Sequence, residues 1–129
     1  MKEGLSGIVH QEKLLQKVAL TQGVFYVASG VWPLVDIDSF QAVTGPKADL
    51  WLVRTVGVLV VVIGSVLITA ARRSKIGVEV VALAVGSALG LAGIDIVYVL
   101  SRTISPIYLA DAVVELGLVT AWMLSRRQA

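Results

Sequence analysis

Four long apolar segments constrain what this chain can fold into more than any other feature of its sequence. They span about residues 18–35, 46–71, 76–100 and 106–124, and a helix rising about 1.5 Å per residue crosses a hydrocarbon core of about 30 Å in such a length. Only 16% of the 129 residues are charged, against about 25% in soluble domains. The sequence therefore predicts an all-α membrane protein, a four-helix transmembrane bundle.

Proline residues mark where three of the segments begin or end. Pro33 stands near the end of the first segment, where a helix terminus is expected. Pro46 and Pro106 open the second and fourth segments, because proline is tolerated at the first position of a helix. We therefore expect a polar cytoplasmic tail over residues 1–17, becoming helical toward its end, and a single membrane domain over residues 18–127.

Basic residues gather on one side of the predicted membrane domain. Eight of them occupy the N-terminal tail, the turn after the second segment and the C-terminal end: Lys2, Lys13, Lys17, Arg72, Arg73, Lys75, Arg126 and Arg127. The other side carries only Lys47 and Arg102. The positive-inside bias places both termini in the cytoplasm. We expect a multi-pass protein of the inner (plasma) membrane whose first partner is the lipid bilayer.

The two halves of the chain resemble one another at small and aliphatic positions. Val18-Ala19-Leu20, Gly23 and Gly30 match Val81-Ala82-Leu83, Gly86 and Gly93 at a constant offset of 63 residues. Two spans per half would give a parallel repeat of two helical hairpins about an axis along the membrane normal. Chance similarity between apolar helices is the alternative.

Small residues also recur every four positions in the third segment. Ala82, Gly86 and Gly90 share this spacing, which lets helix backbones approach closely in lipid. We therefore expect close helix packing along this face of the third segment.

Three carboxylates lie inside the last two segments, in sequence otherwise suited to hydrocarbon: Asp95, Asp111 and Glu115. A charged residue at the centre of a spanning helix costs about 2.5–3.5 kcal/mol on insertion scales, so such residues usually face a bundle interior and mark a site. Counting about 1.5 Å per residue from each segment centre places Arg54, Asp95 and Asp111 about 7–10 Å outward of the midplane, with Glu115 close to it.

This polar cluster has two interpretations. In the first interpretation, Arg54 pairs with one or two of the acids, and the cluster only fixes helix packing. In the second, the excess of carboxylates matters: one arginine cannot neutralise three, so at least one acid holds a proton or pairs with a bound cation or ligand. Asp95 and Tyr98 share a helix face, and Trp32 and Tyr26 reach the same region from the first segment. The predicted ligand-binding residues are Arg54, Asp95, Asp111, Glu115, Tyr98, Trp32 and Tyr26.

Many kinds of chemistry have no signature in this sequence. It has no cysteine, its only histidine is His10 outside the segments, and it lacks phosphate-binding, catalytic-triad and dinucleotide motifs. Its basic residues flank the segments, which gives no support to nucleic-acid binding. We expect no metal, no cofactor and no catalytic residue, and transport by so few spans would need a homo-oligomer.

The chain is similar to small bacterial four-span membrane proteins in the motif Thr44-Gly45-Pro46-Lys47-x-Asp49-x-Trp51-Leu52-Val53-Arg54-Thr55-Val56-Gly57. The arrangement of spans resembles the broader DoxX-like and EXPERA-type four-helix membrane proteins. EXPERA-type members, such as sterol isomerases and the sigma-2 receptor, use membrane-buried carboxylates around a lipophilic or amine ligand. The resemblance implies that role for Asp95, Asp111 and Glu115. The chain lacks the histidine that sterol isomerases place within their spans, which argues against isomerase chemistry.

Three functions follow from these features, in descending order of support. The first is binding or carrying a lipophilic or cationic small molecule, with or without proton coupling, in the outer half of the bundle. The second is a structural or accessory subunit that packs against other membrane proteins through the glycine face of the third segment. The third is a membrane enzyme with a carboxylic acid and a carboxylate as an acid/base pair on a lipid-like substrate. The sequence favours a role other than catalysis.

Overall fold

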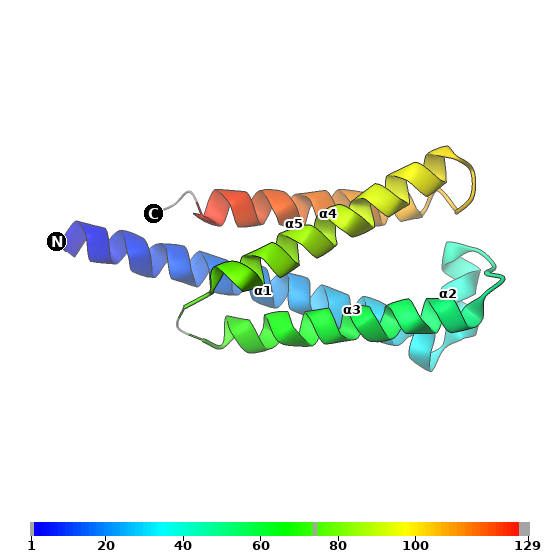
Figure 1. Ribbon diagram of the computed structural model, residues 1–129, viewed down its shortest axis with the longest axis horizontal. Helices are drawn as coiled ribbons and strands as arrows, with labels where there is room; N and C mark the ends of the chain where they lie inside the picture. The colour runs from blue at the N-terminus through cyan, green and yellow to red at the C-terminus, as the bar shows by residue number, and fades with distance from the viewer. Residues whose placement is uncertain (1, 74, 127–129) are drawn as a thin grey trace.

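The computed structural model describes residues 2–73 and 75–126, with side chains from Ser6 onward. Its helices are α1 (Lys2–Val35), α2 (Ile37–Thr44), α3 (Leu50–Ala71), α4 (Val78–Leu100) and α5 (Tyr108–Arg126) (Figure 1). All except α2 are long and apolar enough to cross a membrane. The prediction of an all-α fold is confirmed for these residues, and four of the helices are long and apolar enough to be the predicted spans.

Helix α1 is longer than one membrane crossing requires. Its 34 residues extend about 51 Å at 1.5 Å per residue, and its N-terminal part projects beyond the other helices (Figure 1). The tail expected over residues 1–17 is therefore helical from Lys2 onward. This stretch lacks proline and is rich in Leu, Lys, Glu and Gln, which favour helix. Met1 and Arg127, at the limits of the predicted regions, lie outside the described residues.

The connection between the first two spans contains a short helix that the sequence analysis did not predict. Asp36 caps α2, because its carboxylate accepts a hydrogen bond from the backbone N–H of Ser39 at 3.1 Å. Gly45 ends α2 with a φ of +98°, a conformation that favours glycine. Helix α3 then begins at Leu50, later than the expected start near Pro46.

Two pairs of glycines bring α1 and α3 into close contact. A Cβ added to Gly30 would stand 2.5 Å from the carbonyl oxygen of Gly57, and one added to Gly64 would stand 2.7 Å from that of Gly23. Real Cβ atoms do not tolerate such distances. The two helices therefore approach as closely as they do only because all four positions lack a side chain.

The chain forms two helical hairpins, α1 with α3 and α4 with α5. The glycines matched in the predicted repeat have different surroundings in the two hairpins. Gly23 and Gly30 lie in the α1–α3 contact, whereas nothing lies within 4 Å of a Cβ built on Gly86 or Gly93. Gly90 is equally open, so the expected close packing through Gly86 and Gly90 does not occur between the described helices of this chain. The repeat itself stays a prediction.

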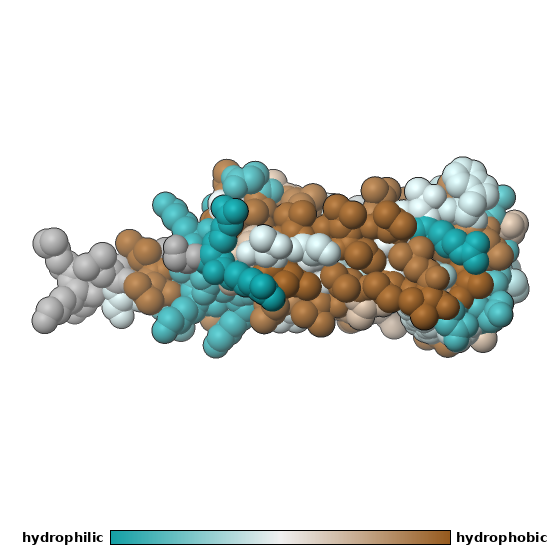
Figure 2. All heavy atoms as spheres, turned by 90° about the horizontal axis from the view of Figure 1, so that it is seen from below, coloured by the Kyte–Doolittle hydropathy of each residue, from teal (hydrophilic) through white to brown (hydrophobic). Residues whose placement is uncertain are grey.

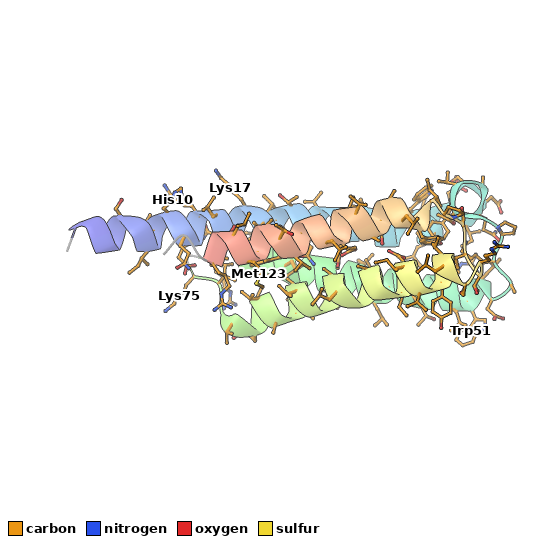
Figure 3. All side chains as sticks on the ribbon, turned by 90° about the horizontal axis from the view of Figure 1, so that it is seen from above. His10, Lys17, Trp51, Lys75 and Met123 are labelled. Carbon is orange, nitrogen blue, oxygen red and sulfur yellow. The ribbon has the colours of Figure 1, made fainter. Side chains whose placement is uncertain are left out.

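The surface carries the bands expected of a membrane protein. Figure 2 shows a broad hydrophobic belt with hydrophilic residues toward both ends of the bundle. Lys17 and Lys75 lie at one end and Trp51 at the other (Figure 3). The fold thus separates the basic turn after α3 from the α2 end, and which side faces the cytoplasm stays a prediction.

An apolar core fills the half of the bundle nearest the α3–α4 turn. It consists of Leu15, Ala19, Leu67, Ala70, Ile76, Val81, Ala84 and Trp122. Both hairpins contribute, so the core holds them together at this end. The opposite half, beneath α2, contains the carboxylates Asp95, Asp111 and Glu115.

Candidate ligand-binding site

A cavity of about 560 Å³ lies in the half of the bundle beneath α2. Its wall is mainly aromatic and aliphatic and draws on all five helices: Phe25, Tyr26, Trp32, Pro33, Phe40, Val53, Val56, Val60, Leu91, Ile107, Tyr108 and Val114. The charged side chains on the wall are Lys47, Asp95, Asp111 and Glu115. A largely apolar cavity with a few convergent polar groups is typical of small-molecule sites.

The three predicted carboxylates line this one cavity. Asp95 of α4 is 5% exposed and Glu115 of α5 is 1% exposed. Asp111 precedes Glu115 by four residues, on the same face of α5, and is partly exposed. Among the described residues, no group of three Asp, Glu, His or Cys side chains is placed to hold a metal ion.

Glu115 and Asp95 differ in how their oxygens are satisfied. The hydroxyl of Tyr26 donates a hydrogen bond to Oε2 of Glu115 at 2.6 Å. Oδ2 of Asp95 is buried and has no hydrogen-bond partner among the described residues. An unpaired buried polar atom costs about 1–3 kcal/mol, and more when it is charged. Asp95 therefore presents to this wall a buried oxygen that no described residue satisfies.

Lys47 is a basic residue of the cavity that the sequence analysis did not select. Its ammonium donates to the carbonyl oxygens of Thr44 at 3.0 Å and Gly45 at 2.7 Å, and to the Thr44 hydroxyl at 3.3 Å. It also lies 5.2 Å from the ring centroid of Tyr108 and 5.9 Å from that of Phe40, within cation–π range. Three acceptors use its three N–H groups, so the Lys47 ammonium is held against Thr44 and Gly45 on the cavity wall.

Arg54 and Tyr98 are predicted site residues that do not line the cavity. Arg54 is exposed on α3, and Tyr98 is 42% exposed on α4. The expected pairing of Arg54 with the acids is absent among the described residues. The depth of a residue along a helix does not fix the direction of its side chain around the helix axis, because each residue is rotated about 100° from the previous one. Val53 and Val56 face the cavity, and Arg54 points elsewhere.

Trp32 does line the cavity, as expected, and is held in place by α2. Its indole N–H donates to the hydroxyl of Ser39 at 2.9 Å. Its ring meets that of Phe40 edge-on, with centroids 5.4 Å apart. The short helix thus positions an aromatic side chain of α1 on the cavity wall.

A second buried polar group, Gln22, lies one turn from Tyr26 on α1. Its side-chain N–H donates to the carbonyl oxygen of Ala84 at 3.0 Å, and its oxygen accepts from the indole N–H of Trp122 at 2.7 Å. Gln22 and Trp122 are fully buried. This pair ties α1, α4 and α5 together beside the apolar core. The sequence signal for this pair is the amide side chain of Gln22 inside an apolar segment, and a search for charged residues alone does not find it.

Searches of protein-family models, curated proteins and solved structures found no match to this chain.

Proposed function

We propose that this chain is a small integral membrane protein that binds or carries a lipophilic or cationic small molecule in the cavity beneath α2. The observation that carries the proposal is Asp95, whose Oδ2 is buried on an apolar wall without a partner among the described residues. A cation, or a donor N–H on a ligand, would supply the missing interaction.

The balance of charge on the wall supports a ligand of positive charge. Three carboxylates line the cavity, and Lys47 is its only basic residue within the described chain. The three N–H groups of Lys47 are already bonded to Thr44 and Gly45. A cationic ligand would therefore meet carboxylates for which the described residues of the cavity supply no free basic group.

The walls support a ligand that is also lipophilic. Val56 of α3 and Val114 of α5 line the cavity and yet are 50% and 43% exposed. The cavity therefore reaches the surface between α3 and α5, and both residues lie inside helices apolar enough to span a membrane. A molecule dissolved in the bilayer would reach the carboxylates by this opening without crossing α2.

A pair of isosteric ions tests the proposal. Purified protein in nanodiscs would be titrated with tetraphenylphosphonium, a lipophilic cation, and with tetraphenylborate, an anion of nearly the same shape, after subtraction of binding to empty nanodiscs. We expect the cation to bind at least about tenfold more tightly, corresponding to about 1.4 kcal/mol. Equal binding of the two ions, or tighter binding of the anion, would contradict the proposal.

The open glycine face of α4 supports a second candidate function, a subunit that assembles with other membrane proteins or with copies of itself. A Cβ built on Gly86, Gly90 or Gly93 meets nothing within 4 Å, so this face leaves room for another helix to approach. Gly86→Leu would then break the assembly, measured as the mass of the protein–detergent particle. Gly117→Leu on α5, where a Cβ also meets nothing, is the matched control. An unchanged mass in Gly86→Leu would reject this function.

A further inference from the structure

A groove of about 500 Å³ lies between α3 and α4, at the end of the bundle remote from the carboxylate cavity. Val62, Val66 and Val80 form its apolar wall. Arg73 and Lys75, from the turn that joins the two helices, line its far end. The groove thus runs from the hydrophobic belt into the basic end of the molecule, where Lys75 is seen in Figure 3.

Helix α1 fixes the backbone on both sides of this basic turn. The side-chain amide of Gln16 donates to the carbonyl oxygen of Arg73. The carboxylate of Glu12 accepts from the backbone N–H of Ile76 at 3.0 Å. Helix α1 therefore holds the backbone at Arg73 and at the residue after Lys75 before any ligand arrives, which lowers the entropic cost of binding one.

The negative charge of Glu79 does not neutralise both positive charges of the groove. Glu79 lines the groove, but its carboxylate folds back over Gly77 and occupies the space where a Cβ of that residue would lie. Gly77 is the N-cap of α4, and a carboxylate at a helix N-terminus is stabilised by the helix dipole. Arg73 and Lys75 are both exposed, which leaves their charges available to an anion.

We propose that this groove binds an anionic phospholipid, with its phosphate at Arg73 and Lys75 and an acyl chain along the valine wall. The basic end of the groove suits the phosphate of such a molecule, and the valine wall suits its acyl chain. A soluble phosphate would leave the apolar wall unfilled, and a zwitterionic lipid would bring no net charge to the basic end. Basic pockets between spanning helices on the cytoplasmic side bind acidic headgroups in this way.

Two adjacent arginines provide the test. Arg72 and Arg73 are both exposed and belong to the same turn, but only Arg73 lines the groove. Wild type, Arg73→Gln and Arg72→Gln would be placed in nanodiscs of equal parts phosphatidylglycerol and phosphatidylcholine, then extracted gently for native mass spectrometry. We expect Arg73→Gln to retain about fivefold less phosphatidylglycerol than Arg72→Gln, from about 1 kcal/mol per basic residue near a membrane surface.

The apolar part of the groove is tested separately. Val66→Trp would fill the wall without changing charge, and it should lower retention of phosphatidylglycerol, while 1 mM glycerol 3-phosphate should not displace the lipid from wild type. Equal losses in Arg72→Gln and Arg73→Gln would overturn the proposal, since general surface charge would then explain retention. Equal retention of phosphatidylcholine and phosphatidylglycerol, or displacement by glycerol 3-phosphate, would also overturn it.

Discussion

The phenol of Tyr26 donates a 2.6 Å hydrogen bond to the carboxylate of Glu115, joining residues 89 positions apart in the chain. Both side chains are almost fully buried, at 1% exposure each. The bond connects α1 of the first hairpin to α5 of the second, at the inner edge of the carboxylate cavity. It therefore joins the two hairpins and leaves Oδ2 of Asp95, on α4, without a hydrogen-bond partner among the described residues.

Tyr26→Phe is expected to destabilise the protein, because it leaves the buried Glu115 without its donor. The free energy of unfolding should fall by about 1–2 kcal/mol, because a hydrogen bond to a charged group is stronger than the average hydrogen bond between membrane helices. Thermal unfolding in detergent measures it. Tyr98→Phe, at a tyrosine exposed on α4, is the control and should change stability by less than about 0.5 kcal/mol. Similar losses in the two variants would show that the bond contributes nothing.

Gly30→Ala is expected to separate α1 from α3, because its Cβ would stand 2.5 Å from the carbonyl oxygen of Gly57. Gly93→Ala, at the position matched to Gly30 in the two halves of the sequence, meets nothing within 4 Å. We expect a loss of about 1–3 kcal/mol for Gly30→Ala, as for other overpacked positions. Gly93→Ala should be neutral or stabilising. Melting temperatures measure both effects. Equal changes in the two variants would contradict the close contact of α1 and α3 through their glycines.

How far the sequence predicts this fold is clearest at the glycines. Segment length and hydropathy predict the four spans, and proline and tryptophan predict the end of α1 near Val35. Neither property predicts which face of a span meets another helix, because the spans are apolar on every side. Gly86 and Gly90 have the spacing of a close contact yet are open, while the seam uses Gly57 and Gly64, seven residues apart.

Lys47→Gln is expected to tighten binding of a lipophilic cation severalfold. Its ammonium lines the same cavity as the carboxylates, so its removal lowers the repulsion felt by a positive ligand. Arg54→Gln removes an equal charge from an exposed position outside the cavity and should change affinity less. Titration with tetraphenylphosphonium compares the two variants. A larger effect of Arg54→Gln would restore Arg54 as the counter-ion that the sequence analysis expected.

The candidate site, like the fold, can be predicted from the sequence only in part. Burial of Asp95 and Glu115 follows from the cost of a charge in hydrocarbon, and the pairing of Asp111 with Glu115 on one face follows from helix periodicity. The sequence does not predict that Lys47 lines the cavity, because it lies in a connection and its position depends on α2 and on the turn at Gly45. The prediction of Arg54 as a site residue rests on its depth along α3, which carries no information on the direction of its side chain around the helix axis.

If Asp95 serves a ligand and not packing, Asp95→Asn should lower ligand affinity without lowering stability. Asparagine keeps the shape and removes the charge, so the empty variant should melt at the same temperature as wild type or higher. Its affinity for tetraphenylphosphonium should fall by about tenfold or more. Glu79→Gln, which removes an acid outside the cavity, is the control and should bind like wild type. A variant that melts lower while its affinity is unchanged would contradict the account and assign Asp95 to packing.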